Sequence, residues 1–504
     1  MAYRRNLFVE KTPTRLKRKV YQTETMHIII KNMIKIEEAP GSLISYCKKY
    51  LAFENPVYKE AQFFGRYTRG INKYIKIFEE DEGSLYLPKG FLPELLSKSA
   101  EMGIDVTITD ETVKQKEPID YGSIIKLRDY QEEFVSAILK TKFGGIAVAP
   151  PGSGKTVTAL EVIARLGMKA LWLTHTSDLL RQTTERAEQF LPNAKLGYIG
   201  SGKWKEGDIT IALVQTLVRR DLTELGEQYP LVIIDECHHT PSSSFTTIVT
   251  KLSACLVIGL SATPYRKDGL EDIMFNVVGP TVATVEKKRL IEAGEIIPAT
   301  VIQRKTGLVI NENIADYAKV MEKVYESKPR LDKIVGDVLA EALDENICVV
   351  LTRTIAYGKK IFEELSEFGI NPSFVYSAEV IKGPGKKKKS VVMPRAVKEE
   401  NITNFISGKT NVIIATIGFL AEGFDHKPLN RLFLVNPISH KNRTLIEQAC
   451  GRVERPFPGK EEALVVDYVD GHSMLETQAR NRIEIYEDNL MTVKYSNMKT
   501  DYLL

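Results

Sequence analysis

The chain has 504 residues, of which 43% are hydrophobic and 27% charged, values typical of a soluble globular protein with room for roughly three domains. No apolar run approaches the ~20 residues of a membrane-spanning helix, and residues 1–19 lack the apolar core of a secretory signal. Five cysteines lie far apart without paired spacing, which argues against disulfides and a zinc site and fits a reducing cytosol.

The net charge of +4 is unevenly distributed along the chain. Residues 1–25 contain seven Lys or Arg against two Glu, a net charge of +5, so the rest of the chain is close to neutral. A basic arm of this kind usually contacts nucleic acid, and a solvated tail is the alternative. We therefore expect a basic N-terminal arm that approaches a polyanion.

After the arm, residues 26–115 are predicted to form a small α/β domain that binds DNA. Its expected elements are a strand at 27–36, a helix at 42–50, a strand at 74–78 and a helix at 92–102. Between them, Phe63, Phe64 and Tyr67 are interleaved with arginines, which would suit a nucleic-acid face. Large aromatic side chains are more often buried, so we expect these three in the core.

The following part of the chain repeats an apolar strand and then a helix, the pattern of parallel sheets with helices on their faces. It divides into one unit over residues 116–295 and a second over 296–470. The clearest predicted strands lie at 170–174, 209–214, 231–234, 255–260, 348–351, 373–376, 412–415, 431–435 and 464–466. Residues 471–504 are predicted to form a helix and a loose tail.

A candidate phosphate-binding loop, residues 149–156, follows the apolar run 145–148. Its small residues Pro151, Gly152, Ser153 and Gly154 would let backbone N–H groups approach phosphates, and the next helix would point its positive end at the same anion. Lys155 would reach the β- and γ-phosphates, and Thr156 would bind Mg²⁺. The usual pattern begins with Gly, where this chain has Ala149.

A second apolar run, 231–234, ends in the carboxylates Asp235 and Glu236. A buried strand would place Asp235 to bind Mg²⁺ and Glu236 to activate a water molecule. A chain with the phosphate loop and this acidic pair, in this order, is predicted to hydrolyse a nucleoside triphosphate.

A basic insertion at residues 382–395 interrupts the second unit. It contains Lys386, Lys387, Lys388 and Lys389 after a Gly-Pro-Gly turn signal. The turn signal and the flanking apolar residues predict a basic hairpin or loop that projects from the sheet, and a disordered insertion is the alternative.

Further short motifs fall in a fixed order along the chain. They lie at residues 127–131, 149–156, 175–182, 215–216, 235–238 with 261–264, 415–416 with 422–425, and 448–455. This series resembles the superfamily 2 helicases and covers about residues 116–470. The resemblance implies two tandem RecA-like parallel-sheet lobes, preceded here by the small α/β domain, with ATP and Mg²⁺ bound between the lobes.

The resemblance also implies a role for each matching residue. Arg128 and Gln131 would read the adenine, and Gly423 and Asp425 would join the nucleotide-binding set. His238 and residues 261–263 would link the nucleotide state to the interface between the lobes. Gln448, Arg452 and Arg455 would approach the γ-phosphate from the second lobe, where arginines stabilise the transition state of phosphoryl transfer. Candidate contacts to the nucleic-acid backbone are Thr176, Thr216, Arg353, Thr354 and Thr416, together with the four lysines of the insertion.

Details of the motifs favour one branch of the superfamily. The acidic motif reads Asp-Glu-Cys-His, and the arginine motif begins with Gln448, both of which point away from RNA unwinding. Residues 259–269 and the small N-terminal domain resemble the UvsW-like phage branch-migration helicases, with XPB-like motor motifs. The resemblance implies a monomeric, cytoplasmic, ATP-dependent DNA helicase that remodels forks or Holliday junctions in replication, recombination or repair.

Two other functions stay open. One is a translocating subunit of a restriction system, for which no convincing nuclease motif accompanies the motor. The other is an ATP-switched DNA clamp or repair scaffold with little motor action, which strand-displacement assays would distinguish from a helicase.

Overall fold

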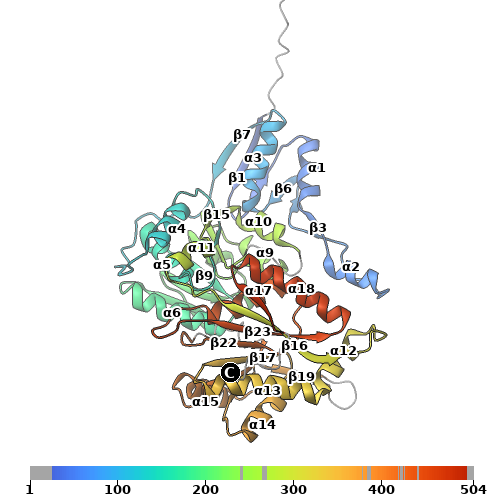
Figure 1. Cartoon of the computed structure of the whole chain (residues 1–504). Helices are drawn as coiled ribbons and strands as arrows, with labels where there is room; N and C mark the ends of the chain where they lie inside the picture. The colour runs from blue at the N-terminus through green and yellow to red at the C-terminus, as the bar shows by residue number, and fades with distance from the viewer. Residues whose placement is uncertain are drawn as a thin grey trace, which may run out of the picture.

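Three main β-sheets follow one another along the chain in the computed structural model (Figure 1). The structure describes residues 25–238, 242–263, 269–376, 378–382, 388–417, 419, 424, 426–439 and 442–496. Most of the basic arm, Lys386, Lys387, Gly423 and Asp425 therefore lie outside the described residues. In the view of Figure 1, the N-terminal sheet lies above the first lobe and the second lobe lies below it.

The N-terminal sheet has the strand order β5-β6-β2-β1-β7. Its strands are β1 (Thr25–Ile30), β2 (Ile34–Ile36), β5 (Glu79–Asp81), β6 (Ser84–Leu87) and β7 (Asp105–Asp110). The single strand predicted at 27–36 is in fact the antiparallel pair β1 and β2, because the chain reverses at residues 31–33. Alternate residues of β1 are buried, and the helices α1 (Gly41–Tyr50) and α3 (Leu92–Glu101) contribute to the same core.

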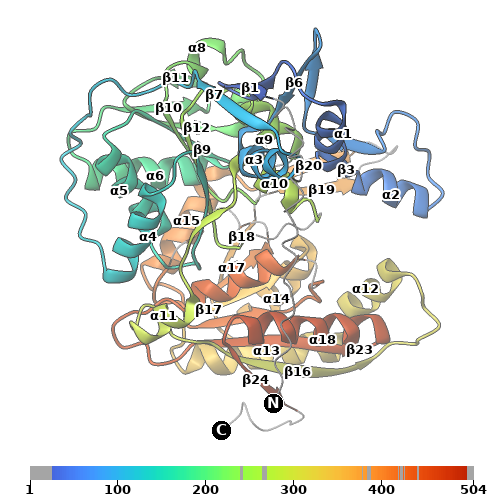
Figure 2. The same cartoon turned by 90° about the horizontal axis from the view of Figure 1, so that it is seen from above.

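A separate projection leaves this sheet at β3 (Ala52–Glu54), passes through helix α2 (Pro56–Phe63) and returns at β4 (Tyr74–Lys76). Asn55 caps α2 by accepting a hydrogen bond from Val57 N, and Ala61 is the residue of α2 that is buried. Helix α2 lies at the margin of the molecule in both views (Figures 1 and 2).

The expectation that the aromatic residues of this stretch belong to the core is wrong. Phe63 is 84% exposed, Tyr67 is 73% exposed, and Phe64 is also exposed. A helix as short as α2, standing away from the sheets, has no opposing layer that could cover these rings. The guanidinium of Arg66 lies 5.0 Å from the centroid of the Phe64 ring, so basic and aromatic groups share this surface.

The first lobe has the strand order β11-β10-β12-β9-β13-β14-β8-β15, and every neighbouring pair is parallel except β10 with β11. The strands are β8 (Gly144–Val148), β9 (Ala170–Thr174), β10 (Leu196–Gly200), β11 (Lys203–Lys205), β12 (Ile209–Leu213), β13 (Leu231–Ile234), β14 (Leu256–Ser261) and β15 (Thr281–Thr284). Because parallel strands end at one edge, the loops after β8, β9 and β13 meet there.

Helices connect the strands of the first lobe and bury apolar residues against them. They are α4 (Asp129–Leu139), α5 (Lys155–Leu166), α6 (Ser177–Phe190), α7 (Val214–Leu217), α8 (Thr223–Gly226), α9 (Ser242–Val249), α10 (Glu271–Val278) and α11 (Lys287–Glu292).

The second lobe has the strand order β18-β21-β17-β22-β23-β16-β24, and its neighbouring strands are all parallel. The strands are β16 (Thr300–Val309), β17 (Cys348–Thr352), β18 (Ser373–Val375), β21 (Val412–Thr416), β22 (Arg431–Leu434), β23 (Leu464–Gly471) and β24 (Thr492–Ser496). The helices include α12 (Tyr317–Glu326), α13 (Lys328–Leu343), α14 (Ile355–Glu367), α15 (Arg395–Ile406), α17 (Arg443–Val453) and α18 (Ser473–Asp488).

Two parallel sheets in tandem, each covered by helices, confirm the predicted α/β fold class with RecA-like lobes. The C-terminal stretch contains the expected helix, α18, and also β24, which was expected to be part of a loose tail. Strand β24 pairs in parallel with β16 and so covers an edge that β16 would otherwise expose.

The basic insertion forms an antiparallel hairpin, in which β19 (Ala378–Lys382) pairs with β20 (Lys388–Val392). The prediction of a hairpin is therefore confirmed for the backbone of the strands. The hairpin lies between β18 and α15 along the chain and belongs to neither large sheet.

The N-terminal sheet is packed tightly on the first lobe. Its core is continuous with one side of the first-lobe sheet, and Lys89 Nζ donates to Ala254 O at 2.6 Å. A Cβ on Gly90 would lie 2.6 Å from Asn276 O, so this contact requires glycine. Within the described ranges, no helix has the length and apolar character needed to cross a membrane.

Candidate active site

A cavity of about 900 Å³ lies where the two lobes face each other. The first lobe contributes residues from the phosphate loop, the ends of β9 and β13, and α6 and α7, and the second lobe contributes residues of α17 and the chain around it. Of the predicted site residues, the cavity is lined by Arg128, Pro151, Gly152, Ser153, Gly154, Lys155, Thr156, Thr176, Asp235, Glu236, Gln448, Arg452 and Arg455. Most of the residues predicted from separate motifs are therefore brought together.

The loop after β8 has the geometry of an anion cradle. Gly152 and Gly154 have φ values of +86° and +83°, in the left-handed region that glycine occupies without strain. The loop ends at Lys155, where the 12-residue helix α5 begins, so the free N–H groups of the helix face the cavity. A backbone of this shape, at the positive end of a helix, binds phosphate oxygens.

The departure from the usual motif at Ala149 has a structural explanation. Ala149 is 1% exposed, its methyl group belongs to the first-lobe core, and its N–H donates to Ser261 O at 3.0 Å. The loop therefore turns toward the cavity only after this position, and a methyl group at Ala149 does not obstruct it.

Two polar side chains of the loop are oriented by the protein itself. Lys155 Nζ donates to Ala149 O at 2.9 Å and so lies across the mouth of the loop. Ser153 Oγ is buried and has no hydrogen-bond partner among the described residues. Lys155 can replace its local bond to Ala149 O with a bond to a ligand oxygen, and Ser153 Oγ can bind such an oxygen directly.

Gln131 supports the loop and does not line the cavity. Its Nε2 donates to Ser153 O at 3.0 Å, and its Oε1 accepts from Arg128 N at 3.0 Å in a capping box at the start of α4. Arg128 lines the cavity, and its Nε lies 2.8 Å from Glu295 Oε1. Of the two residues predicted to read the adenine, Arg128 lines the cavity and Gln131 lies behind the phosphate loop.

The acidic pair stands at the end of β13, beside the phosphate loop. Burial and the neighbouring Glu236 raise the pKa of Asp235 to about 7, against the opposing effect of Lys155. Glu236 has a φ of +46°, which is unusual for a residue with a side chain, and its carbonyl oxygen lies 3.1 Å from His175 Nε2. Strain of this kind at a strand end is typical of functional sites.

His238 connects the acidic motif to the next strand end. Its Nδ1 lies 2.8 Å from Ser261 Oγ, which also donates to Thr263 O. His238 is buried and does not line the cavity. The two segments predicted to link the nucleotide state to the interface between the lobes, His238 and residues 261–263, are therefore in direct side-chain contact.

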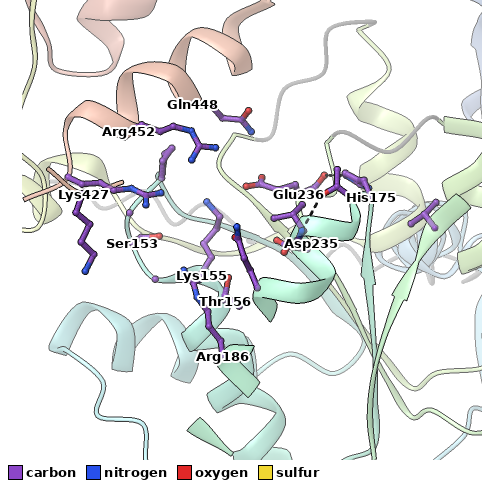
Figure 3. A pocket seen from close by; sticks show the side chains of 18 of the residues that line it. Ser153, Lys155, Thr156, His175, Arg186, Asp235, Glu236, Lys427, Gln448 and Arg452 are labelled. Carbon is purple, nitrogen blue, oxygen red and sulfur yellow. Dashed lines mark hydrogen bonds between the residues drawn. The ribbon is translucent and has the colours of Figure 1, made fainter. Parts of the chain in front are cut away.

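The second lobe approaches the phosphate loop through α17. A Cβ on Gly451 would lie 2.9 Å from Pro151 Cβ, so glycine permits the closest approach of the helix to the loop. Figure 3 shows Gln448 and Arg452 on this helix, facing the loop that carries Ser153 and Lys155. Arg452 Nη1 donates to Phe424 O, which fixes its direction. Positive charge from one lobe thus faces the anion cradle of the other.

A buried ion pair joins the chain between the lobes to the end of α17. Lys287 Nζ lies 2.6 Å from Glu454 Oε2, and Glu454 O accepts from Ile297 N at 2.8 Å. Burial raises the pKa of Glu454, and Lys287 opposes this shift. The linker is therefore attached to the helix that carries Arg452.

The same hydrogen-bond arrangement occurs after β9 in the first lobe and after β17 in the second lobe. Thr174 Oγ1 donates to Thr176 O at 3.3 Å, and Thr352 Oγ1 donates to Thr354 O at 3.2 Å. Thr176 and Thr354 then cap α6 and α14 by accepting from the N–H three residues on. These caps use the hydroxyl oxygens as acceptors, so each O–H can still donate to a phosphate oxygen, as can the helix N–H groups beside it.

The other predicted nucleic-acid residues lie away from the cavity. Thr416 ends β21, Thr216 lies in α7, and Arg353 follows β17. These positions all belong to the carboxyl edges of the two sheets, or to the loops that follow them. Among the described residues, Thr216, Arg353, Thr354 and Thr416 do not line the cavity.

Several cavity residues were not predicted from the sequence. The polar ones include Glu295 before the second lobe, Lys427 of the second lobe, and Gln182, Arg186 and Arg219 of the first lobe. Glu295 and Lys427 lie outside the motifs used for the prediction. Gln182, in contrast, ends the motif at residues 175–182 and could have been included.

The residues present fit Mg²⁺ in the way that the motifs predict. Thr156 and Asp235 line one cavity, and the buried carboxylate of Asp235 stands beside a second carboxylate, Glu236, at the end of β13. A cation would compensate these negative charges. In the stretches of chain that the structure describes, no group of three or more His, Cys, Asp or Glu side chains forms a metal site, so phosphate oxygens and water would complete the coordination.

Comparison with known proteins agrees with this geometry. Residues 124–266 match the family model described as "Type III restriction enzyme, res subunit". The chain is 29% identical over 372 residues to the DNA 3'-5' translocase XPB2 of Sulfurisphaera tokodaii, covering 68% of this chain and 82% of that protein. The chain is thus similar to a DNA translocase over about two thirds of its length, and the matched family model lies within the first lobe.

Solved structures agree on the fold. The ATP-dependent Type ISP restriction-modification enzyme LlaBIII bound to DNA matches with a TM-score of 0.52 and 16% identity, over 80% of this chain and 34% of that one. The chain thus spans about a third of that enzyme. The structure of T4 UvsW covers 94% of this chain and 98% of that chain, but with a TM-score of 0.41 and 16% identity it does not assign the chain to the UvsW-like branch.

Proposed function

We propose that the protein is an ATP-dependent DNA helicase or translocase that remodels branched DNA. The observation that carries the proposal is that one cavity holds the anion cradle, the acidic pair and the arginines of the opposite lobe. Each of these groups serves phosphoryl transfer, and their division between two lobes makes hydrolysis depend on how the lobes meet.

The residues divide the chemistry among them. The loop N–H groups and Lys155 bind the phosphates, and Thr156 and Asp235 would hold Mg²⁺, which would supply positive charge to the phosphate oxygens. Glu236 orients the attacking water, and Arg452 and Arg455 stabilise charge on the transferred group from the second lobe. Arg128, which lines the cavity close to the loop, lies where it can contact the base.

Work on DNA would follow from closure of the lobes. The γ-phosphate is contacted from both sides, so its binding favours a closed arrangement and its release an open one. The carboxyl edges of both sheets carry residues that are candidates to contact the DNA backbone. If the two lobes bind and release DNA in turn, each cycle of closure moves the protein along the strand. DNA is proposed as the polymer because the motif details point away from RNA unwinding and because the chain resembles a DNA translocase over most of that protein's length.

The projection around α2 supports a nucleic-acid partner. Its exposed rings lie beside Arg66, and Lys73 Nζ lies 5.3 Å from the centroid of the Tyr74 ring. Exposed aromatic groups interleaved with cations bind unpaired bases by stacking, at about 1–3 kcal/mol per base. We propose that this surface, residues 63–74, holds the single-stranded portion of a branched substrate.

Replacing Phe63 and Tyr67 with alanine should lower affinity for a forked DNA by about 30-fold or more, because two stacking contacts are lost and each costs about 1–3 kcal/mol. Affinity for a linear blunt duplex should change little, and fluorescence anisotropy would measure both. Phe368→Ala is a matched control, since Phe368 is an exposed ring on the second lobe outside this surface. Equal losses on both DNAs would contradict a role in holding single strands.

The basic hairpin is proposed to meet the duplex at the branch. Four consecutive lysines, 386–389, are costly to place against protein and favourable to place against phosphate. The antiparallel pairing of β19 and β20 supports a projection stiff enough to separate the strands of a duplex.

Replacing Lys386, Lys387, Lys388 and Lys389 with alanine should reduce unwinding of a forked duplex more than it reduces DNA-stimulated ATP hydrolysis. Loss of four phosphate contacts should also lower the log–log salt slope of DNA binding by about 3–4 units. Both activities should be measured side by side at one salt concentration. Proportionate losses would indicate general affinity alone, and unchanged activities would rule out the role of the hairpin.

The matched family model and the LlaBIII structure favour a second candidate, the translocating component of a restriction-type assembly. ATP hydrolysis and unwinding compared on forked, four-way and linear DNA, with a forked RNA alongside, distinguish the two. A branch-remodelling helicase should act best on forked and four-way DNA. Hydrolysis that follows the length of a linear duplex, without strand displacement, would favour the restriction-type translocase.

A further inference from the structure

The segment after β22, residues 435–438, leads from the second sheet toward α17 and is fixed at both ends by buried arginines. Arg330 Nη2 donates to Val435 O at 2.8 Å, and Arg482 Nη1 donates to Ile438 O at 2.7 Å. Each arginine is also paired with a buried aspartate, so neither is free to move away. The segment is thus a stiff element next to the helix that carries Gln448 and Arg452.

Between these two fixed points stands Asn436, which is 1% exposed. Its Oδ1 accepts a hydrogen bond from Arg353 N at 2.7 Å, across the carboxyl ends of the neighbouring strands β22 and β17. Its Nδ2 is buried and has no partner among the residues that the structure describes. The bond to Arg353 is therefore the contact that orients this side chain.

We infer that Asn436 is a positioning residue that couples nucleic-acid contact at the turn of Arg353 and Thr354 to the placement of α17 at the ATP cavity. The inference rests on the proposed function, in which that turn grips the DNA backbone. When a DNA phosphate binds at the turn of Arg353 and Thr354, the position of Arg353 N changes, and with it the hydrogen bond that this N–H donates to Asn436 Oδ1. Residues 435–438 connect β22 to the chain that leads into α17, so a change in the Asn436 contact is expected to alter how that helix presents Arg452 to the cavity.

Coupling of this kind has two measurable sides, a kinetic one in ATP turnover and an equilibrium one in DNA affinity, and strict reciprocity applies to the binding free energies. DNA should increase ATP turnover through Asn436, and bound ATP analogue should increase DNA affinity through the same bond. A residue that merely stabilised the lobe would lower both activities without changing their dependence on each other.

The chain contains a matched control at the opposite end of the same two strands. Asn430 stands directly before β22, and its Oδ1 accepts from Ile347 N, directly before β17, at 2.9 Å. The residue type, the strand pair and the kind of bond are the same, but this end of the sheet faces away from the cavity. Asn430 Nδ2 also donates to Asn346 Oδ1 at 2.8 Å, so Asn430→Ala removes at least as many hydrogen bonds as Asn436→Ala and reports their cost without the coupling.

The experiment compares Asn436→Ala, Asn430→Ala and the unmodified full chain. ATP turnover is measured without DNA and with saturating forked DNA, and the dissociation constant for that DNA is measured with and without a non-hydrolysable ATP analogue. In Asn436→Ala, turnover without DNA should stay within about twofold, whereas the stimulation by DNA and the effect of the analogue on DNA affinity should each fall about tenfold. The KM for ATP without DNA should be unchanged, and Asn430→Ala should retain both effects.

Equal losses in the two asparagine variants, or a loss of turnover without DNA in Asn436→Ala, would overturn the inference. Absence of DNA-stimulated ATP hydrolysis in the unmodified protein would instead contradict the proposed function itself. Should alanine prevent folding, as judged by thermal unfolding, Asn436→Ser gives the same test, because its shorter side chain withdraws the acceptor from Arg353 while keeping a polar group.

Discussion

Lys155→Ala should lower ATP turnover by about 10³-fold, the scale on which removal of one preorganised electrostatic contact slows a reaction. Lys155 stands at the junction of the anion cradle and helix α5, and its ammonium group lies across the mouth of the loop. Without it, the phosphates lose their main positive side-chain partner on the first lobe. DNA binding should stay largely intact, because Lys155 faces the cavity and not the outer edge of the sheet.

Glu236→Gln tests the same site from the chemical side. The amide keeps the size of the side chain but cannot take a proton from water, so ATP should bind and the closed state should persist. Turnover and binding of a fluorescent ATP analogue would be measured for both variants. Lys140→Ala is the control, because Lys140 is an exposed lysine of the same lobe that does not line the cavity. Near-normal turnover in Lys155→Ala or Glu236→Gln would refute the assignment of the site.

Arg452→Ala and Arg455→Ala should each lower turnover by about 10³-fold, as expected for arginines that stabilise charge on a transferred phosphoryl group. Both residues line the cavity from the second lobe, and the close approach of Gly451 to Pro151 brings α17, which carries Arg452 and ends two residues before Arg455, against the phosphate loop. Binding of an ATP analogue should weaken far less than turnover, because the first lobe alone supplies the cradle.

Arg443→Ala is the matched control for these two arginines. It lies on the same helix, but its guanidinium pairs with Glu447 and Asp488 and does not line the cavity. Its turnover should stay within a few-fold of the unmodified protein. If Arg452→Ala and Arg455→Ala hydrolyse ATP as well as Arg443→Ala does, the two lobes do not form a joint site.

The features that the sequence predicts most directly are those encoded in contiguous residues. The phosphate loop, the acidic pair and the arginine motif each occupy a few neighbouring positions, and the physical demands of phosphate binding restrict which residues can stand there. The runs of buried strand residues predicted two parallel sheets for the same reason, because such strands are apolar on both faces. The turn signals of the basic insertion predicted its hairpin.

Other features were decided by contacts between distant segments of the chain. The aromatic residues near α2 look like core residues from their type, but no layer covers them. Strand β24 forms because β16 leaves an edge open, which its own short sequence does not reveal. Gln131 supports the loop from behind, although the motif alone suggested direct contact with the base.

The sequence by itself therefore determined the set of chemical groups and the order of the two sheets, because local residue patterns specify strands, loops and phosphate-binding turns. The tertiary structure alone decided which groups meet. The contacts of Arg128 with Glu295, Lys287 with Glu454 and Arg353 with Asn436 each join residues more than 80 positions apart. The periodicity of apolar residues along the sequence does not reveal these contacts. They form only when the carboxyl edges of the sheets and the chain between the lobes pack against each other.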